Sequence, residues 1–582
     1  MPLTPIPFHH VKIDSPFWSP RLKTASVTAR VCLEQCEKTG RLSNFRRAAG
    51  REDGGFQGEY FNDSDVYKVL EGIAYLLANQ PDPELEARAD QVIDDICAAQ
   101  QPDGYLNTWF TLAEPDKRWT DMGLHEAYCI GHLVEGAVAY AQATGKEALL
   151  QCAERVIAHM MDVFGPGKRH WVTGHQELEL ALVRLYRHTG KQAYLDFAHW
   201  LISERGHGHM DAWSLTRQNF LEPYAQDIAP AAQQRRVTGH AVRAMYYYTG
   251  MADTDAAAGR SEYRQALESL WQDTYPGNTY ITGGIGQSYM HEGFTRAWHK
   301  PNLTAYCETC AAIGMAMWNH RMGLMDGATQ YADLVETELY NGALSGISLD
   351  GRRFFYDNPL ASIGRHHRSE WFYCSCCPTN LCRFVPSIGG YAYARRGNVL
   401  CVNQYIGGTL DTPGIRMHVE TNYPWDGKVT FTVESLSGID MLHLRVPGWC
   451  REARLTSAAG VTCATDGTLT AAIREGDVVT LELAMPIERI HEDERVTECR
   501  GRVCVRRGPV VYCAEETDNP GLPAEYFPAD MALPASTQLQ VGAPMAELAD
   551  ALPIVGDGIR LIPYTLWDNR EGGAMAVWLR ET

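Results

Sequence analysis

The chain has 582 residues, a formal net charge of −19 at pH 7 and 45% hydrophobic residues. The acidic balance argues against a nucleic-acid partner and against an anionic membrane surface, because both require a basic footprint. The apolar content argues against disorder. Seventeen cysteines are many for one chain, and its start resembles no secretory signal. We therefore expect no membrane span, a cytoplasmic location, reduced thiols, and metal binding or chemistry for any clustered cysteines.

Helical periodicity dominates roughly the first 390 residues. Residues 131–142 carry an apolar face at helical spacing, made of Leu133, Val134, Ala137, Val138 and Ala141. The same helical pattern recurs at 177–202 and 239–250, and the predicted helices end at Gly145, Gly190 and Gly250. Glycine there can supply the left-handed turn that ends a helix. The repeat predicts helical hairpins, arranged either as a closed ring of six or as an open α-solenoid.

Three histidines stand at or near the starts of predicted helices: His125, His175 and His240. In a helical ring, the loops at one end bring such residues to one mouth. Each histidine taken alone could equally cap its helix or pack locally. The recurrence in three hairpins favours a shared site.

After residue 390 the pattern changes to short alternating runs, such as KVTFTVE at 428–434 and VVTLEL at 478–483. Separated by turn residues, these runs predict antiparallel β-sandwich material. We expect a catalytic helical domain at 1–390, a first sandwich at 391–500 and a second at 501–582. The extreme N-terminus could join a sandwich, and the joint is expected near 388–391.

The densest chemical signal lies in two short segments, CETC at 307–310 and CSCCPTN at 374–380. Together they offer Glu308 and five sulfurs, which suit a tetrahedral zinc ion, although neither segment matches a zinc ribbon. A structural metal site would use four sulfurs, whereas a catalytic one would use a reactive thiolate as ligand. A zinc-stapled carbohydrate-binding protein is therefore one alternative to an enzyme.

Two glutamates near these segments differ in their surroundings. Glu292 follows the glycine-rich stretch YITGGIG, in a loop that suits an acid/base better than a regular helix face does. Glu336 lies in the helical pattern YADLVETELYNG, where a solvated or salt-bridged side chain is the simpler reading.

Ordered motifs from about residue 60 to 570 give the chain a family resemblance. NDSDVYK, DGYL, the three histidine segments, HEGF, CETC, CSCCPTN, NYPWDG, RGPVVYCAE and LIPYTLWDNRE occur in one order. The sequence resembles the β-L-arabinofuranosidases of glycoside hydrolase family 127. The resemblance implies an (α/α)6 barrel followed by β-sandwich domains, and it suggests a homodimer. It also implies retaining release of terminal β-L-arabinofuranose from small oligosaccharides, such as β-1,2-linked disaccharides.

The same resemblance assigns roles to individual residues. It implies a Zn²⁺ ion held by Glu308, Cys310, Cys376 and Cys377, with Cys376 as nucleophile and Glu292 as general acid/base. It implies a sugar pocket lined by His125, His175, His240, Glu336 and Tyr356. Cys307 and Cys374 receive no role. A hydrolase of a related modified furanoside stays open, as does a sugar epimerase or lyase on the same ring, although the latter would not need the cysteine segments.

Overall fold

The computed structural model describes residues 2–210 and 224–582. Six inner helices form a ring in which each contacts the next and the last returns to the first. They are α3 (Asp63–Asn79), α6 (Glu126–Thr144), α8 (Leu178–Thr189), α11 (Ala241–Ala258), α13 (Thr309–Asp326) and α15 (Cys376–Ser387). The closed ring confirms the (α/α)6 barrel and excludes an open solenoid.

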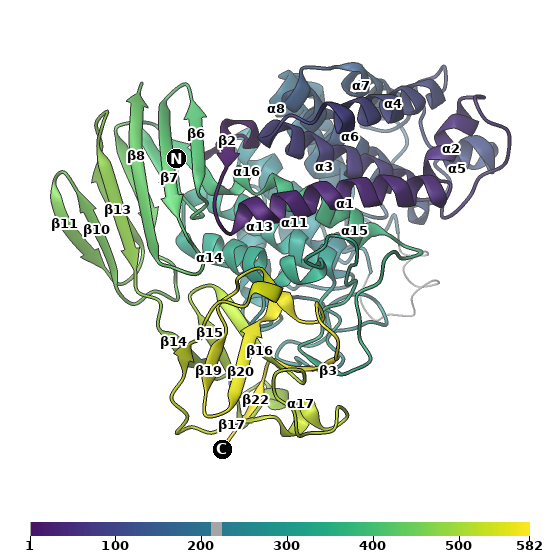
Figure 1. Cartoon of the computed structure of the whole chain (residues 1–582). Coiled ribbons are helices and arrows are strands. Elements are labelled where there is room, and N and C mark those ends of the chain that lie inside the picture. The colour runs from purple at the N-terminus through teal and green to yellow at the C-terminus, as the bar shows by residue number, and fades with distance from the viewer. Residues whose placement is uncertain (1, 211–223) are drawn as a thin grey trace.

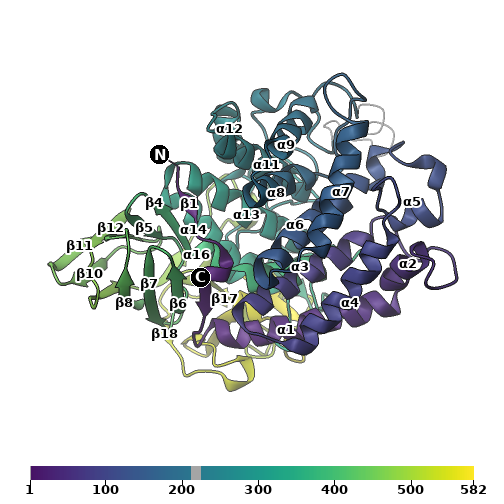
Figure 2. The same cartoon turned by 90° about the horizontal axis from the view of Figure 1, so that it is seen from above.

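An outer layer of helices surrounds this ring (Figure 2). Its members are α1 (Trp18–Lys38), α4 (Pro83–Ala99), α7 (Ala148–Val163), α9 (Gln192–Glu204), α12 (Arg264–Thr274) and α14 (Thr329–Thr337). Local sequence signals fix several helix ends; in α4, for example, the Asp82 side chain accepts a hydrogen bond from the Leu85 N–H. The described residues also form four short helices: α2 (Arg41–Ala48), α5 (Thr108–Leu112), α16 (Gly389–Ala392) and α17 (Phe527–Asp530).

The predicted glycine stops are right in two cases and wrong in the third. Helices α6 and α8 end at Gly145 and Gly190, with φ of 75° and 71°. Helix α11 instead runs through Gly250 and ends at Gly259, where φ is 62°. A Cβ on Gly250 would lie 2.9 Å from the Glu179 Cβ, so this glycine lets α11 pack closely against α8.

Two sheets next to the barrel form a β-sandwich, seen in green in Figure 1. One sheet has the order β1 (Thr4–Pro5), β4 (Tyr393–Arg396), β5 (Val399–Val402), β9 (Met441–Arg445), β12 (Thr468–Ala472). The other has the order β11 (Gly460–Ala464), β10 (Ala453–Ser457), β13 (Val478–Leu483), β8 (Lys428–Leu436), β7 (Ile415–Thr421), β6 (Gly408–Thr412), β2 (Val11–Ile13). Strand β7 alternates buried and exposed residues, as expected for one buried face. The N-terminal strands β1 and β2 thus add one edge strand to each sheet.

A third sheet forms the C-terminal β domain, below the barrel in Figure 1. Its main path is β17 (Ala532–Leu533), β22 (Leu579–Glu581), β15 (Arg502–Arg507), β16 (Val510–Glu515), β20 (Ile559–Pro563), β19 (Ile554–Gly556), β18 (Gln540–Val541). Strands β14 (Ile487–Ile490), β21 (Ala574–Ala576) and β3 (Ala361–Ile363) join it off this path. Since β14 already pairs with β15, the strands of this domain begin ahead of the expected division at residue 500.

The C-terminal β domain packs against loops that precede the inner helices. The Tyr564 hydroxyl donates to the Pro359 carbonyl oxygen at 3.0 Å, and Asn341 bonds both the Pro509 oxygen and the Val511 N–H at 2.8 Å. A shared apolar cluster includes Tyr280, Cys307 and Phe355 from the loops. This domain therefore supports the end of the barrel at which the inner helices start. Among the residues described, no helix is long and apolar enough to cross a membrane.

Candidate active site

A cavity of about 310 Å³ opens where the six inner helices begin. It brings together eight of the predicted site residues, which come from the starts of five helices and from two loops. They are His125, His175, His240, Glu292, Glu308, Cys310, Tyr356 and Cys376. Cys377 is buried directly behind this lining, next to Cys376.

Three sulfurs and one carboxylate form a compact cluster at the floor of the cavity. The Cys310 and Cys377 Sγ atoms lie 3.4 Å apart, and the Cys376 and Cys377 Sγ atoms 3.9 Å apart. Glu308 Oε1 lies 3.5 Å from the Cys376 sulfur and 3.7 Å from the Cys377 sulfur. All 17 cysteines are free thiols.

These four side chains fit a tetrahedral metal ion. A zinc ion with Zn–S bonds of about 2.3 Å needs sulfurs about 3.8 Å apart, which is close to the spacing seen here. The second oxygen of Glu308 is buried without a hydrogen-bond partner, and burial raises the pKa of Glu308 and of Cys377 well above their ordinary values. A cation bound between these sulfur and oxygen atoms would satisfy them, whereas apolar surroundings alone leave them without partners.

The N-termini of two helices provide an electrostatic field that also favours anionic sulfur. Cys376 and Cys377 are the first two residues of α15, Cys310 is the second residue of α13, and Glu308 is its N-cap. Helix N-termini carry partial positive charge, which stabilises thiolates and carboxylates there. The sequence thus places these sulfurs at helix N-termini, whose field opposes the cost of burying an anionic sulfur.

Glu292 faces the same cavity from a tight loop and is held by three donors. Because His240 Nδ1 accepts the N–H groups of Val242 and Arg243, its neutral ring carries the proton on Nε2, 3.2 Å from Glu292 Oε2. The hydroxyls of Tyr224 and Tyr306 each donate to Glu292 at 3.0 Å. Burial alone would raise the pKa of Glu292, but these bonds outweigh it and lower the pKa to about 2.

The three predicted histidines form one continuous wall. Ring centroids lie 5.5 Å apart between His125 and His175 and 5.6 Å apart between His175 and His240. Nδ1 of His125 bonds the Gly123 carbonyl oxygen at 2.7 Å. Burial lowers the pKa of His125 to about 3, so this ring is neutral near pH 7. Tyr356 completes the opposite side, with its hydroxyl 3.0 Å from the Cys376 sulfur.

Glu336, expected in the sugar pocket, lies elsewhere, and that expectation is corrected. Its side chain is 1% exposed and does not line the cavity. Its oxygens accept hydrogen bonds from the first β-sandwich: Tyr423 Oη at 2.5 Å, Arg445 Nη2 at 2.6 Å and Trp449 Nε1 at 2.9 Å. The prediction from its helical context, a salt-bridged glutamate, is the one that the structure confirms for Glu336.

Several lining residues escaped the sequence analysis. Tyr60, Phe61, Tyr128, Tyr224 and Arg243 face the cavity, and Cys374 lies beside Cys376 with its sulfur 3.6 Å from the Tyr356 hydroxyl. Arg243 had a usable signal, since it follows His240 by one helical turn. Tyr224 lies in no motif, and only the fold brings it to Glu292.

Family models match three successive parts of the chain. Residues 10–390 match the β-L-arabinofuranosidase GH127 catalytic domain, residues 399–485 its middle domain, and residues 487–580 the family's C-terminal domain. A non-reducing end β-L-arabinofuranosidase from Bifidobacterium longum subsp. longum is 36% identical, covering 93% of this chain and 92% of that protein.

Solved structures give the same result. A GH127 β-L-arabinofuranosidase from Geobacillus stearothermophilus T6 has a TM-score of 0.91 at 38% identity, covering 98% of this chain and 100% of that one. A second GH127 β-arabinofuranosidase has a TM-score of 0.91 at 36% identity, with 100% and 98% coverage. The chain is a glycoside hydrolase and belongs to family 127, the β-L-arabinofuranosidases.

Proposed function

We propose that this enzyme releases L-arabinose from non-reducing terminal β-L-arabinofuranosides, including β-1,2-linked disaccharides, with retention of configuration. The observation that carries the proposal is a single cavity faced by both the Cys376 thiol and the Glu292 carboxylate. Its volume of about 310 Å³ suits one terminal furanose more than a long chain. The names of the two relatives above agree with this substrate class.

Cys376 is the proposed nucleophile. Its sulfur attacks the anomeric carbon, a C–S bond forms, and the bond from that carbon to the glycosidic oxygen breaks. Tyr356, with its hydroxyl 3.0 Å from this sulfur, orients it. Glu308, Cys310, Cys376 and Cys377 would hold a zinc ion. Such an ion keeps bound thiols ionised at neutral pH.

Glu292 is the proposed acid and base. In the first step its carboxyl group gives a proton to the departing glycosidic oxygen. In the second step the carboxylate takes a proton from water, whose oxygen bonds the anomeric carbon while the C–S bond breaks. His125 and His175 are proposed to accept hydrogen bonds from the furanose hydroxyls, because each neutral ring uses Nδ1 on a backbone carbonyl oxygen and leaves Nε2 free. His240 is proposed to line the same pocket while its Nε2–H holds Glu292.

Substitution of the nucleophile tests the proposal. We expect Cys376→Ser to lower hydrolysis of an aryl β-L-arabinofuranoside by about a thousandfold or more, since a serine hydroxyl is a much weaker nucleophile. Cys374→Ser, which changes a neighbouring thiol in the same cavity, is the matched control and should stay within about tenfold of wild type. Hydrolysis by Cys376→Ser at a near-normal rate would sink the nucleophile assignment.

Metal content gives an independent measurement. We expect about one equivalent of tightly bound zinc per chain after purification without chelator, measured by elemental mass spectrometry. Cys310→Ser should lose most of this zinc, because a tetrahedral site rarely survives the loss of one ligand. Cys463→Ser, an exposed and isolated thiol, should retain it. Equal zinc in both variants would contradict the ligand set.

A further inference from the structure

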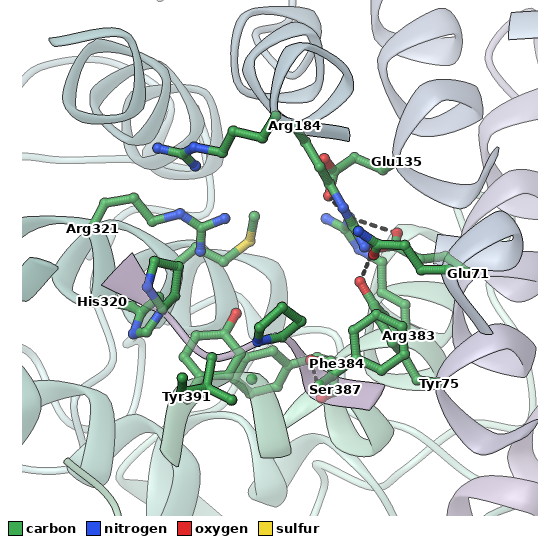
Figure 3. A pocket seen from close by; sticks show the side chains of 18 of the residues that line it. Glu71, Tyr75, Glu135, Arg184, His320, Arg321, Arg383, Phe384, Ser387 and Tyr391 are labelled. Carbon is green, nitrogen blue, oxygen red and sulfur yellow. Dashed lines mark hydrogen bonds and ion pairs between the residues drawn. The ribbon is translucent and has the colours of Figure 1, made fainter. Parts of the chain in front are cut away.

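A second cavity lies at the other end of the barrel, and the proposed mechanism makes no use of it. Its volume is about 200 Å³. Residues from the last turns of the inner helices line it, such as Gln142 of α6, Arg187 of α8 and Leu324 of α13. The N-terminal residues 5–8 cover one side. We call it the arginine cavity, after the side chains that Figure 3 shows.

Four arginines from three helices face this cavity: Arg184, Arg187, Arg321 and Arg383. Three carboxylates hold them in place, and two of these, Glu71 and Glu135, also line the cavity. Glu71 accepts from Arg184 at 3.0 Å and from Arg383 at 2.9 Å, and Glu135 accepts from Arg184 at 2.7 Å. Asp253 accepts from Arg187 at 2.7 Å and from Arg321 at 3.2 Å.

These bonds leave guanidinium groups with unused donors. In the hydrogen bonds between described residues, Arg184 donates through Nη1 only and Arg321 through Nε only. Their side chains are 20% and 19% exposed, so the unused groups face the cavity instead of packed protein. In Figure 3, Arg184 and Arg321 extend toward the pocket from different sides.

The charges around the arginine cavity do not balance. Four guanidinium groups face three carboxylates, and His320 adds no charge because burial lowers its pKa to about 3. A fourth carboxyl group, that of Glu177, lies 3.7 Å from Arg383 Nη1. Burial raises the pKa of Glu177 well above its ordinary value, which favours the uncharged form. The inner helices also direct their C-termini to this end of the barrel, and their partial negative charges offset part of the excess. The guanidinium donors that remain unused still need hydrogen-bond acceptors, which an anion in the cavity would supply.

We propose that the arginine cavity binds one small oxyanion, a phosphate or a carboxylate group, between Arg184 and Arg321. Planar guanidinium groups match the geometry of both oxyanions, and two of them from different inner helices, α8 and α13, would hold the anion from two sides. The bound anion would tie α8 to α13. Its expected effect is therefore on stability, with little effect on the distant sulfur cluster.

Thermal unfolding of the full, zinc-loaded chain tests this proposal. The protein is melted in bis-tris propane buffer with inorganic phosphate in one arm, acetate in a second, and sodium chloride of equal ionic strength in a third. We expect a saturable rise in Tm with phosphate or with acetate, and the effective arm identifies the anion class. Calorimetric titration should give one site per chain.

Variants connect the effect to the cavity. Arg321→Gln and Arg184→Gln should each weaken binding of the effective anion by about tenfold or more, because each removes a charged hydrogen-bond donor pair. The exposed Arg416→Gln is the matched control and should bind like wild type. Arg321→Lys keeps the positive charge but loses the planar pair of guanidinium donors, so it should bind the anion with intermediate affinity. This variant replaces Arg321→Gln in the test if the glutamine variant does not fold.

Three results would overturn the proposal. One is a wild-type protein that shows no saturable rise with either oxyanion. Another is a rise of equal size with chloride, which indicates general screening. The third is unchanged binding in Arg321→Gln and Arg184→Gln, since an anion bound near Arg243 in the catalytic cavity would survive both changes.

Discussion

At the scale of single residues, Glu292 has an environment that suits one half of its proposed role better than the other. Three donors, His240, Tyr224 and Tyr306, stabilise its ionised form, which is the form that a general base needs. The acid step needs a proton on the same group. A bound sugar excludes water from the cavity and so disfavours the charged form, which moves the carboxyl toward protonation when the glycosidic oxygen is in place.

Glu292→Gln separates the two steps through the leaving group. We expect a loss of about a hundredfold or more for disaccharides, whose sugar alcohol needs protonation, and a much smaller loss for activated aryl glycosides. The measurement is kcat/KM over a series of leaving groups. The exposed Glu370→Gln controls for the loss of one carboxylate charge outside the cavity. Equal slowing across the series would point to a different acid.

Residues with a chemical signature could be predicted, and those defined only by the fold could not. The cysteines of CETC and CSCC and the three histidines carry their chemistry in their residue type and spacing. The structure brings Cys310, Cys374, Cys376 and the three histidines into one cavity, whereas Cys307 packs in the apolar cluster beside the C-terminal domain. Tyr224 has neither signal, because its importance depends on meeting a glutamate 68 residues away. For Glu336, the family resemblance pointed to the sugar, but the fold pairs it with Arg445.

At the scale of elements, glycines set how closely the inner helices approach. A Cβ on Gly72 of α3 would lie 2.3 Å from the Cys382 carbonyl oxygen of α15. On Gly136 of α6 it would lie 2.9 Å from the Tyr67 oxygen of α3. Such contacts keep the ring tight, and the start of α15 carries Cys376 and Cys377 into the site. Gly250 is a glycine of this kind, although its sequence context predicts a helix stop, because composition alone does not distinguish a turn from a close contact.

Gly72→Ala should therefore loosen the joint between α3 and α15. The added methyl group meets backbone that cannot rotate away, so we expect destabilisation of about 1–3 kcal/mol. Gly55→Ala, where nothing lies within 4 Å of the new methyl group, should change stability by less than about 0.5 kcal/mol. Thermal and denaturant unfolding midpoints measure both. A Gly72→Ala protein as stable as wild type would show that the helices can separate at no cost.

At the scale of the whole molecule, the β domains act as supports for the barrel. Alternating runs after residue 390 predicted strands correctly, but not the pairings that join distant parts of the chain. Strands β1 and β2 enter the sandwich from the N-terminus, and β3 leaves the barrel to pair with β21. These pairings span hundreds of residues, and a local pattern contains no information about them.

Glu336 ties the barrel to the sandwich through three buried hydrogen bonds, and its replacement tests that role. Glu336→Gln leaves the buried Arg445 with fewer anionic partners, so we expect destabilisation of about 3–5 kcal/mol and a lower Tm. The KM of the protein that remains folded should match wild type, because Glu336 does not line the cavity. Glu420→Gln, on the exposed face of β7, should change neither quantity. A raised KM with an unchanged Tm would instead return Glu336 to the sugar site, and the barrel–sandwich joint would then depend on other contacts.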